Sequence, residues 1–208
     1  MAKGSVCAHC GAEMPLRSLA LTCSNACRQA AYRARRKAER AAAVPAELRA
    51  RARWVRHAAK RPMRTDGKWA STTDPSTWSD YATARDCARG EGIGYVLAPG
   101  DGVVVVDLDH AVRADGGLEP WARLIVDALP TTFMERGRSG TGLHLWFRGE
   151  LVHGRKIRRG EVALEVYGRD RYIILGDRVP GSPSELAELP DVAAVISGLV
   201  ATRPGSTP

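Results

Sequence analysis

The sequence predicts an α+β fold, in which mixed β-strands form a sheet with helices beside it. The strongest indication is the run Val103–Val106, four β-branched apolar residues that are typical of a strand buried on both faces. A second indication is the regular alternation of apolar and polar residues in 143–147. A third is the helical spacing of apolar residues between Leu118 and Leu129, which places a helix among the strands.

Three regions are expected along the 208 residues, a length that suits one medium domain and a small one. Residues 1–45 combine closely spaced cysteines with a basic helix. Residues 46–183 carry the strand patterns and form the expected catalytic domain. In 184–208, the segment Ser184–Leu199 has a helical pattern, and the tail after it has the composition of a disordered segment.

The net charge of +8 and the pI of about 9.6 favour a nucleic acid as the partner, because a basic surface attracts phosphates. No apolar run approaches the ~20 residues that a membrane span needs. The first residues also lack the apolar segment of a secretory signal. We therefore expect no membrane partner and a cytoplasmic location, the host cytoplasm if a phage encodes the chain. Disulfides are not expected there.

Paired cysteines in the first 27 residues predict a structural metal site. Their pattern is C-x2-C, a spacer of 12 residues, then C-x3-C. In a reducing compartment this pattern favours one tetrahedral Zn²⁺ over two disulfides. His9 lies so close to the first pair that four thiolates are the simpler ligand set, and Cys87 stands alone as an ordinary thiol. The expected ligands are Cys7, Cys10, Cys23 and Cys27.

A basic helix is expected to follow, with Ser24 as its N-cap and its end near Val44, before Pro45. After Tyr32 it has almost no apolar side chain larger than alanine. Such a helix either projects into solvent or lies on a polyanion. Beside a zinc module in a basic protein, phosphate contact is favoured. The candidate nucleic-acid contacts are Arg33, Arg35, Arg36 and Lys37.

The main domain is expected to begin with two helices, and several strands follow. The helices span Ala46–Ala59 and the stretch from Asp74 to about Gly90. The strand 92–97 and the valine strand should form a hairpin around the turn 99–102. The later strands are expected at 132–135, 143–147, 162–167 and 172–175, the last two as a hairpin around Gly168–Arg171.

Carboxylates in and beside these strands predict a second metal site. Asp107 and Asp109 follow the valines and share one strand face, with Cα atoms roughly 6.5–7 Å apart. Side by side they repel each other unless a cation such as Mg²⁺ or Mn²⁺ binds between them. The alternative is a polar turn after the strand. Glu165 lies in an apolar strand, where it is either a third ligand or the ion-pair partner of Arg138 or Arg171.

A glycine-rich loop supplies candidate phosphate contacts. In the stretch 139–144, S-G-T-G-L-H, glycines allow backbone N–H groups to approach an anion, and hydroxyl and imidazole groups add donors. The basic stretch 155–159 lies between this loop and Glu165, where a triphosphate or template needs cations. The candidate nucleotide contacts are Ser139, Gly140, Gly142, His144 and Lys156.

Together these motifs resemble those of the archaeo-eukaryotic primase superfamily. The order is Asp107-x-Asp109, then S-G-T-G-L-H ending at His144, then a hydrophobic strand containing Glu165. The closer resemblance is to the bifunctional DNA primase–polymerase domain of phages, plasmids and actinobacterial mobile elements. It spans roughly residues 54 to 175, including K-R-P at 60–62.

The resemblance implies a split, RRM-like catalytic sheet and a template-directed primase–polymerase that condenses nucleoside triphosphates on single-stranded DNA. It implies that Asp107, Asp109 and Glu165 bind the divalent metal. It also implies that His144 and Ser139 contact the phosphates of the incoming nucleotide. A separate helicase is a further partner that it suggests. The alternatives are a metal-dependent nuclease that uses the same carboxylates, and a zinc-containing accessory protein that binds nucleic acid without catalysis.

Overall fold

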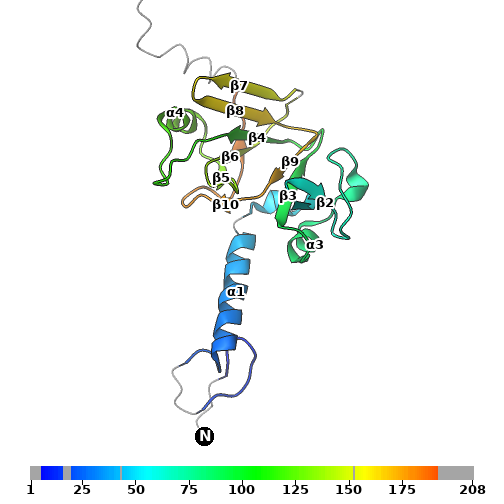
Figure 1. Cartoon of the computed structure of the whole chain (residues 1–208), viewed down its shortest axis with the longest axis vertical. Coiled ribbons are helices and arrows are strands. Elements are labelled where there is room, and N and C mark those ends of the chain that lie inside the picture. Colours follow the sequence, from blue (N-terminus) through cyan, green and yellow to red (C-terminus); the bar gives the residue numbers. More distant parts are fainter. Residues whose placement is uncertain (1–5, 16–19, 43, 152, 192–208) are drawn as a thin grey trace, which may run out of the picture. The chain divides into compact units, whose positions relative to one another are not determined.

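The computed structural model of the chain describes residues 6–15, 20–42, 44–151 and 153–191 (Figure 1). The chain divides into two compact units, 1–43 and 44–208, and each is described here by itself. Among the described residues, no helix has the length and apolar character needed to cross a membrane.

The N-terminal unit consists of a cysteine-bearing loop and the helix α1 (Asn25–Ala42). Gly11 closes the turn after the first cysteine pair with a φ of +73°, which favours glycine, and its N–H donates to the Cys7 carbonyl oxygen at 2.9 Å. The helix begins as predicted, because the Ser24 hydroxyl accepts a 3.2 Å hydrogen bond from the Cys27 N–H.

The larger unit is a mixed α+β structure, as predicted, and its described strands form two sheets. The larger sheet has seven strands, and every pair in it is antiparallel except β11 beside β6. Figure 1 shows its strands stacked in one layer from β7 to β10. Its spatial order is β10 (Asp177–Arg178), β5 (Phe133–Arg136), β6 (Leu143–Arg148), β4 (Val103–Leu108), β8 (Val162–Tyr167) and β7 (Arg155–Arg159). The short strand β11 (Ala187–Glu188) lies outside this order and pairs with the end of β6, at Phe147 and Arg148.

The smaller sheet has four antiparallel strands within the described residues. Short helices complete the unit, and α3 lies against β1 and β3. The strand order is β2 (Arg61–Met63), β1 (Trp54–Ala58), β3 (Gly92–Leu97) and β9 (Arg171–Ile174). The helices are α2 (Ala46–Arg49), the 3₁₀ turn η1 (Pro75–Thr77), α3 (Tyr81–Asp86) and α4 (Pro120–Ala128).

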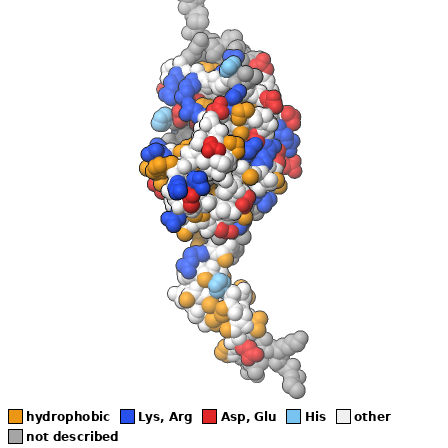
Figure 2. Space-filling view, turned by 90° about the vertical axis from the view of Figure 1, so that its right-hand side faces the viewer, with side chains coloured by type: hydrophobic (Ala, Val, Ile, Leu, Met, Phe, Trp, Pro, Cys, Tyr) orange, Lys and Arg blue, Asp and Glu red, His pale blue; other side chains and the backbone are white. Residues whose placement is uncertain are grey.

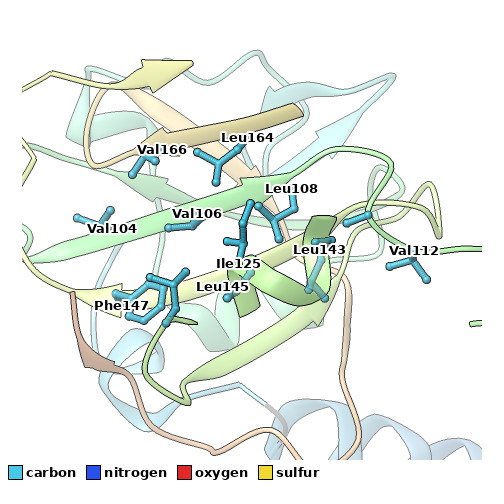
Figure 3. Close-up of a cluster of buried hydrophobic side chains, with 13 residues drawn as sticks. Val104, Val106, Leu108, Val112, Ile125, Leu143, Leu145, Phe147, Leu164 and Val166 are labelled. Carbon is cyan, nitrogen blue, oxygen red and sulfur yellow. The ribbon is translucent and has the colours of Figure 1, made fainter. Parts of the chain in front are cut away.

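One face of the larger sheet is apolar and is covered by α4. Figure 3 shows Ile125, from α4, among side chains of β4, β6 and β8. Along the valine strand, Val104, Val106 and Leu108 are fully buried on this face, as the period of two requires. Because side chains alternate along a strand, Val103, Val105 and Asp107 lie on the opposite face of β4.

The other face of the larger sheet meets the smaller sheet through aromatic rings. Trp54 and Tyr95 stand edge to face with ring centroids 5.1 Å apart, and Tyr95 meets Trp146 in the same way at 5.8 Å. Trp146 is fully buried, whereas His144, two residues earlier on the same face of β6, keeps a side chain that is 12% exposed. The aromatic contact thus ends where the polar residues begin.

The predicted helix Ala46–Ala59 is wrong beyond its first turn. Only α2 is helical, and β1 starts at Trp54. Trp54 and Val55 are 0% and 1% exposed and pair with β3, so burial in the sheet overrides the helical preference of the surrounding alanine and arginine residues.

Both predicted hairpins are also wrong. β3 pairs with β1 and β9, whereas β4 pairs with β6 and β8, so the turn at 99–102 connects two different sheets. Likewise β8 and β9 belong to different sheets, and the turn 168–170 crosses between them. The strands on either side of each turn lie close to their predicted ranges. The sequence of a short turn, however, does not show that these strands join different sheets.

Three other segments differ from the prediction. The stretch from Asp74 to Gly90 holds η1 and α3 rather than one helix. The basic stretch 155–159 is the edge strand β7 rather than a connection. In the predicted helix Ser184–Leu199, the described part contains β11, and residues 192–199 lie outside the described residues.

We expect Leu145→Ala to lower the free energy of unfolding by about 2–5 kcal/mol, because Leu145 is 1% exposed and its loss leaves a cavity in the core. Leu124→Ala on α4 is the matched control, since Leu124 is 57% exposed and its removal should cost no more than about 0.5 kcal/mol. Urea denaturation of the full chain measures both. Equal destabilisation by the two changes would contradict this assignment of the core.

Candidate active site

Polar side chains form a single row across five neighbouring strands of the larger sheet. Pairing places His144 of β6 and Glu165 of β8 on either side of Asp107 of β4. The next strands add Glu135 of β5 opposite His144, and Lys156 of β7 opposite Glu165. Because directly paired residues share a face, all five side chains lie on the face opposite the α4 core.

His144 is held between two carboxylates. Its Nδ1 lies 3.0 Å from Glu135 Oε1, and its Nε2 lies 3.6 Å from Asp107 Oδ1. Burial lowers the pKa of His144, but the hydrogen bond and charge of Glu135, together with the charge of Asp107, outweigh it and raise the pKa above its ordinary value. The ring therefore favours the charged form, in which both nitrogens donate.

Asp107 is the carboxylate at the centre of the row. Burial raises its pKa, although the nearby His144 opposes the shift. The carboxylates of Asp109 and Glu165 raise it further by repulsion. A divalent cation would relieve this repulsion, so the acidic group fits a metal site by its chemistry.

Glu165 faces the basic edge strand. Its Oε1 lies 2.9 Å from Lys156 Nζ and 3.3 Å from an Arg158 guanidinium nitrogen. Burial alone would raise the pKa of Glu165, but the two hydrogen bonds outweigh it and hold the pKa below its ordinary value. The glutamate is therefore ion-paired, but not with either of the arginines considered from the sequence. Arg138 donates to the Glu91 carbonyl oxygen, and Arg171 lies over the Tyr167 ring.

Asp109 lies directly after β4 and continues its pairing, since its N–H donates to the Ala163 carbonyl oxygen at 2.9 Å. Its carboxylate lies 3.6 Å from the Arg158 guanidinium, which thus stands between Asp109 and Glu165. Among the described residues, the three predicted metal-binding carboxylates do not form a group placed closely enough to hold a metal ion. In the same described part of the chain, the four cysteines form such a group.

The glycine-rich loop borders the Nε2 side of His144. A Cβ at Gly137 would lie 3.5 Å from His144 Nε2, so glycine leaves this nitrogen uncovered. Gly137 donates to the Gly142 carbonyl oxygen, which closes the loop, and Gly140 at its tip has a φ of +78°. The Ser139 hydroxyl lies at the exposed tip and accepts from the Thr141 N–H at 3.3 Å. The N–H groups of Gly137, Gly140 and Thr141 are bonded within the loop, so the exposed Ser139 hydroxyl is a donor that the loop can offer to a ligand.

Two residues of the site were missed from the sequence. Glu135 is a carboxylate in the apolar strand F-M-E-R, and the rule that singled out Glu165 would have found it. Arg158 was noted among the basic residues of 155–159 but not chosen, because the alternation of β7 was not recognised. That alternation places Lys156 and Arg158 on one face of the strand.

The residues proposed from the basic helix are only partly described. Arg33 is exposed on α1, while the side chains of Arg35, Arg36 and Lys37 lie outside the described residues. Their contact with nucleic acid therefore stays a prediction.

The cysteines of the N-terminal unit gather as the spacing predicts. The ligand atoms of Cys7, Cys10, Cys23 and Cys27 all lie within 4.8 Å of one another. Cys23 Sγ lies 3.7 Å from Cys10 Sγ and 3.5 Å from Cys27 Sγ. A tetrahedral Zn²⁺ with bonds of about 2.3 Å separates its sulfurs by about 3.8 Å, so the cluster has the size of a metal site.

The thiols of this cluster compete for protons. Hydrogen bonds from the backbone at Cys10, Cys23 and His9 lower the pKa of Cys7 to about 6. Hydrogen bonds with Cys27, Cys10 and Cys7 raise the pKa of Cys23 to about 12. A metal ion bound by the four sulfurs would displace the thiol protons.

A family model and a named phage protein match this chain. The Prim-Pol family model, described as "Bifunctional DNA primase/polymerase, N-terminal", matches residues 21–192. A protein named DNA Primase-polymerase, from Nitratiruptor phage NrS-1, is 34% identical over 132 residues. That match covers 60% of this chain and 18% of the phage protein.

Proposed function

This chain belongs to the family of bifunctional DNA primase/polymerase N-terminal domains, and from this membership we propose that it is a template-directed nucleotidyltransferase. It would condense nucleoside triphosphates on a single-stranded DNA template in a reaction that depends on Mg²⁺ or Mn²⁺. The larger sheet would be the split, RRM-like catalytic sheet of this family. The phage source of the relative suggests the cytoplasm of a bacterial host as the location, and a separate helicase would be a further partner.

The observation that carries the proposal is the polar row on one sheet face. It sets carboxylates beside a histidine and basic side chains, which suits the two demands of nucleotidyl transfer. Asp107, Asp109 and Glu165 supply hard oxygen ligands for a divalent cation. His144 Nε2 and the exposed Ser139 hydroxyl would supply donors for phosphate oxygens.

A bound divalent cation would neutralise triphosphate charge and help to activate the attacking 3′-hydroxyl. The protein's own groups would hold the substrates in line. His144 Nε2, the Ser139 hydroxyl and the backbone at Gly142 would bind phosphate oxygens. The 3′-oxygen then forms a bond to the α-phosphorus, and the bond to pyrophosphate breaks.

Lys156 and Arg158 would exchange partners when substrate binds. Their side chains are 56% and 66% exposed, so they can turn towards a triphosphate at the surface, and the cation would replace them as the partner of the buried Glu165 carboxylate. Glu165 would then be available to the cation. In this interpretation the ion pair and the metal-ligand role of Glu165 belong to successive states of one site.

The cysteine cluster would bind a structural Zn²⁺, and α1 would contact the template through its arginines and lysine. Figure 2 shows Lys and Arg side chains interspersed with Asp and Glu on the larger unit rather than gathered in one broad field on this face. Template affinity would therefore depend on local basic groups, and the basic sequence 33–37 is one such group.

The catalytic assignment is tested by three variants in an assay of nucleotide incorporation on single-stranded template with Mn²⁺. Asp109→Asn keeps the size of the side chain but removes its charge, so we expect a loss of at least about 10²-fold. Glu165→Gln should behave alike. His144→Ala should instead weaken nucleotide affinity by about 1.5–3 kcal/mol, and excess nucleotide should partly restore the rate.

Template binding provides the control, because all three variants should bind single-stranded DNA as the wild type does. Normal polymerisation by Glu165→Gln would leave that residue as an ion-pair partner only. Template degradation by the wild type would favour a metal-dependent nuclease instead. Binding without any incorporation would favour an accessory protein.

The zinc assignment predicts about one Zn²⁺ per chain, the stoichiometry of a four-thiolate structural site. Cys23→Ser should abolish stoichiometric zinc and unfold the N-terminal unit while the main unit stays folded. Cys87→Ser is the matched control, because Cys87 lies in the main unit with its thiol near the Thr65 carbonyl oxygen. Elemental analysis and NMR measure both effects. Well-dispersed N-terminal signals in metal-free protein would contradict the assignment.

The basic-helix assignment predicts weaker binding of single-stranded DNA when Arg33, Arg35, Arg36 and Lys37 are replaced by alanine. Alanine preserves helix propensity, so the change mainly removes charge. The slope of log affinity against log salt should become shallower by up to roughly 0.7 per lost phosphate contact. Fluorescence anisotropy at several salt concentrations measures it, and an unchanged slope would make the helix a solvated spacer.

A further inference from the structure

Glu135 is the most deeply buried ionisable group of the polar row, and the proposed reaction leaves it without a role. Its side chain is 1% exposed and lies in the short strand β5, on the side of His144 away from Asp107. A carboxylate in such a place is costly unless both of its oxygens are paired. Its position therefore calls for a reason.

Both oxygens of Glu135 have donors. Oε1 lies 3.0 Å from His144 Nδ1, and Oε2 accepts the Gly176 backbone N–H at 3.0 Å. Gly176 follows β9, and a Cβ at this position would collide with the Arg136 carbonyl oxygen. The absence of a side chain thus lets the backbone approach closely enough to clamp the carboxylate. Glu135 is fixed from one side and holds the imidazole from the other.

We propose that Glu135 is the positioning residue for His144, holding the ring so that Nε2 faces the nucleotide site. This inference rests on the proposed function for its substrate, the triphosphate of an incoming nucleotide. With Nδ1–H directed to Glu135, the ring cannot rotate without losing a buried hydrogen bond. Nε2 then stays beside Asp107 and the uncovered space at Gly137, where a phosphate oxygen would lie.

The test is a double-mutant cycle of Glu135→Gln and His144→Ala, with nucleotide KM and kcat measured on single-stranded template. Glutamine has one carbonyl oxygen for two donors, so one clamp contact must be lost. We expect Glu135→Gln alone to raise the nucleotide KM about tenfold, the effect of one weakened charge-assisted contact, with a smaller change in kcat. In the His144→Ala background it should raise KM no further.

Glu161→Gln is the matched control, because Glu161 is exposed between β7 and β8 and its change should leave KM unaltered. An equal rise in KM with and without His144 would make Glu135 a structural residue only and overturn the proposal. No rise in either background would overturn it as well.

A second measurement does not need activity. In ¹⁵N-labelled wild-type protein, His144 should show a ring Nδ1–H signal that exchanges slowly with solvent, and the signal should be absent in His144→Ala. Failure to find this proton in folded wild-type protein would overturn the positioning role even if polymerisation is normal. Wild-type protein with the protected proton but without nucleotide binding would instead contradict the proposed function.

Discussion

The pairing register of the valine strand is the constraint on which the site depends. β4 is central, and its pairs with β6 and β8 place Asp107 directly between His144 and Glu165. Side chains alternate with a period of two, so a slip of one residue would turn Asp107 into the apolar core and a valine into the site. The valines do not specify the register by themselves, because valine stands on both faces of the strand; the cost of a slip comes from Asp107, whose carboxylate would enter the apolar core beneath α4.

Packing on both faces makes this strand a rigid support. One face lies under α4, and the other is covered by the aromatic contact between Tyr95 and Trp146 up to the point where the polar row starts. Polar side chains can therefore stand on a strand whose backbone is fixed by the core, which is the arrangement that holds reacting groups in place. The Asp109 N–H extends the pairing by one residue, so the second aspartate also lies on fixed backbone.

Local patterns in the sequence predicted the α+β class, the valine strand, the helix near Leu118 and the cysteine cluster, because each depends on neighbouring residues. The partners of the strands were not predictable in this way. Both hairpin predictions were wrong because β3 and β9 belong to the smaller sheet, whereas β4 and β8 belong to the larger one. The sequence of a short turn does not show that the strands on either side of it join different sheets. β7 was missed because its sequence, R-K-I-R-R, has basic residues on both faces and so lacks the alternation of apolar and polar residues. Glu135 could have been found by the rule that singled out Glu165, but its position opposite His144 is known only from the strand pairing.

The two acidic residues of β4 and β8 in the row, Asp107 and Glu165, have different electrostatic surroundings. Glu165 faces β7, whose cations hold its pKa low, whereas burial and neighbouring carboxylates raise the pKa of Asp107. A bound cation would relieve the repulsion that the neighbouring carboxylates exert on Asp107. The positive charges of Lys156 and Arg158 lie at the exposed edge of the sheet. In the proposed reaction, a triphosphate and its cation would meet both carboxylates, and Lys156 and Arg158 would exchange Glu165 for contacts with the substrate.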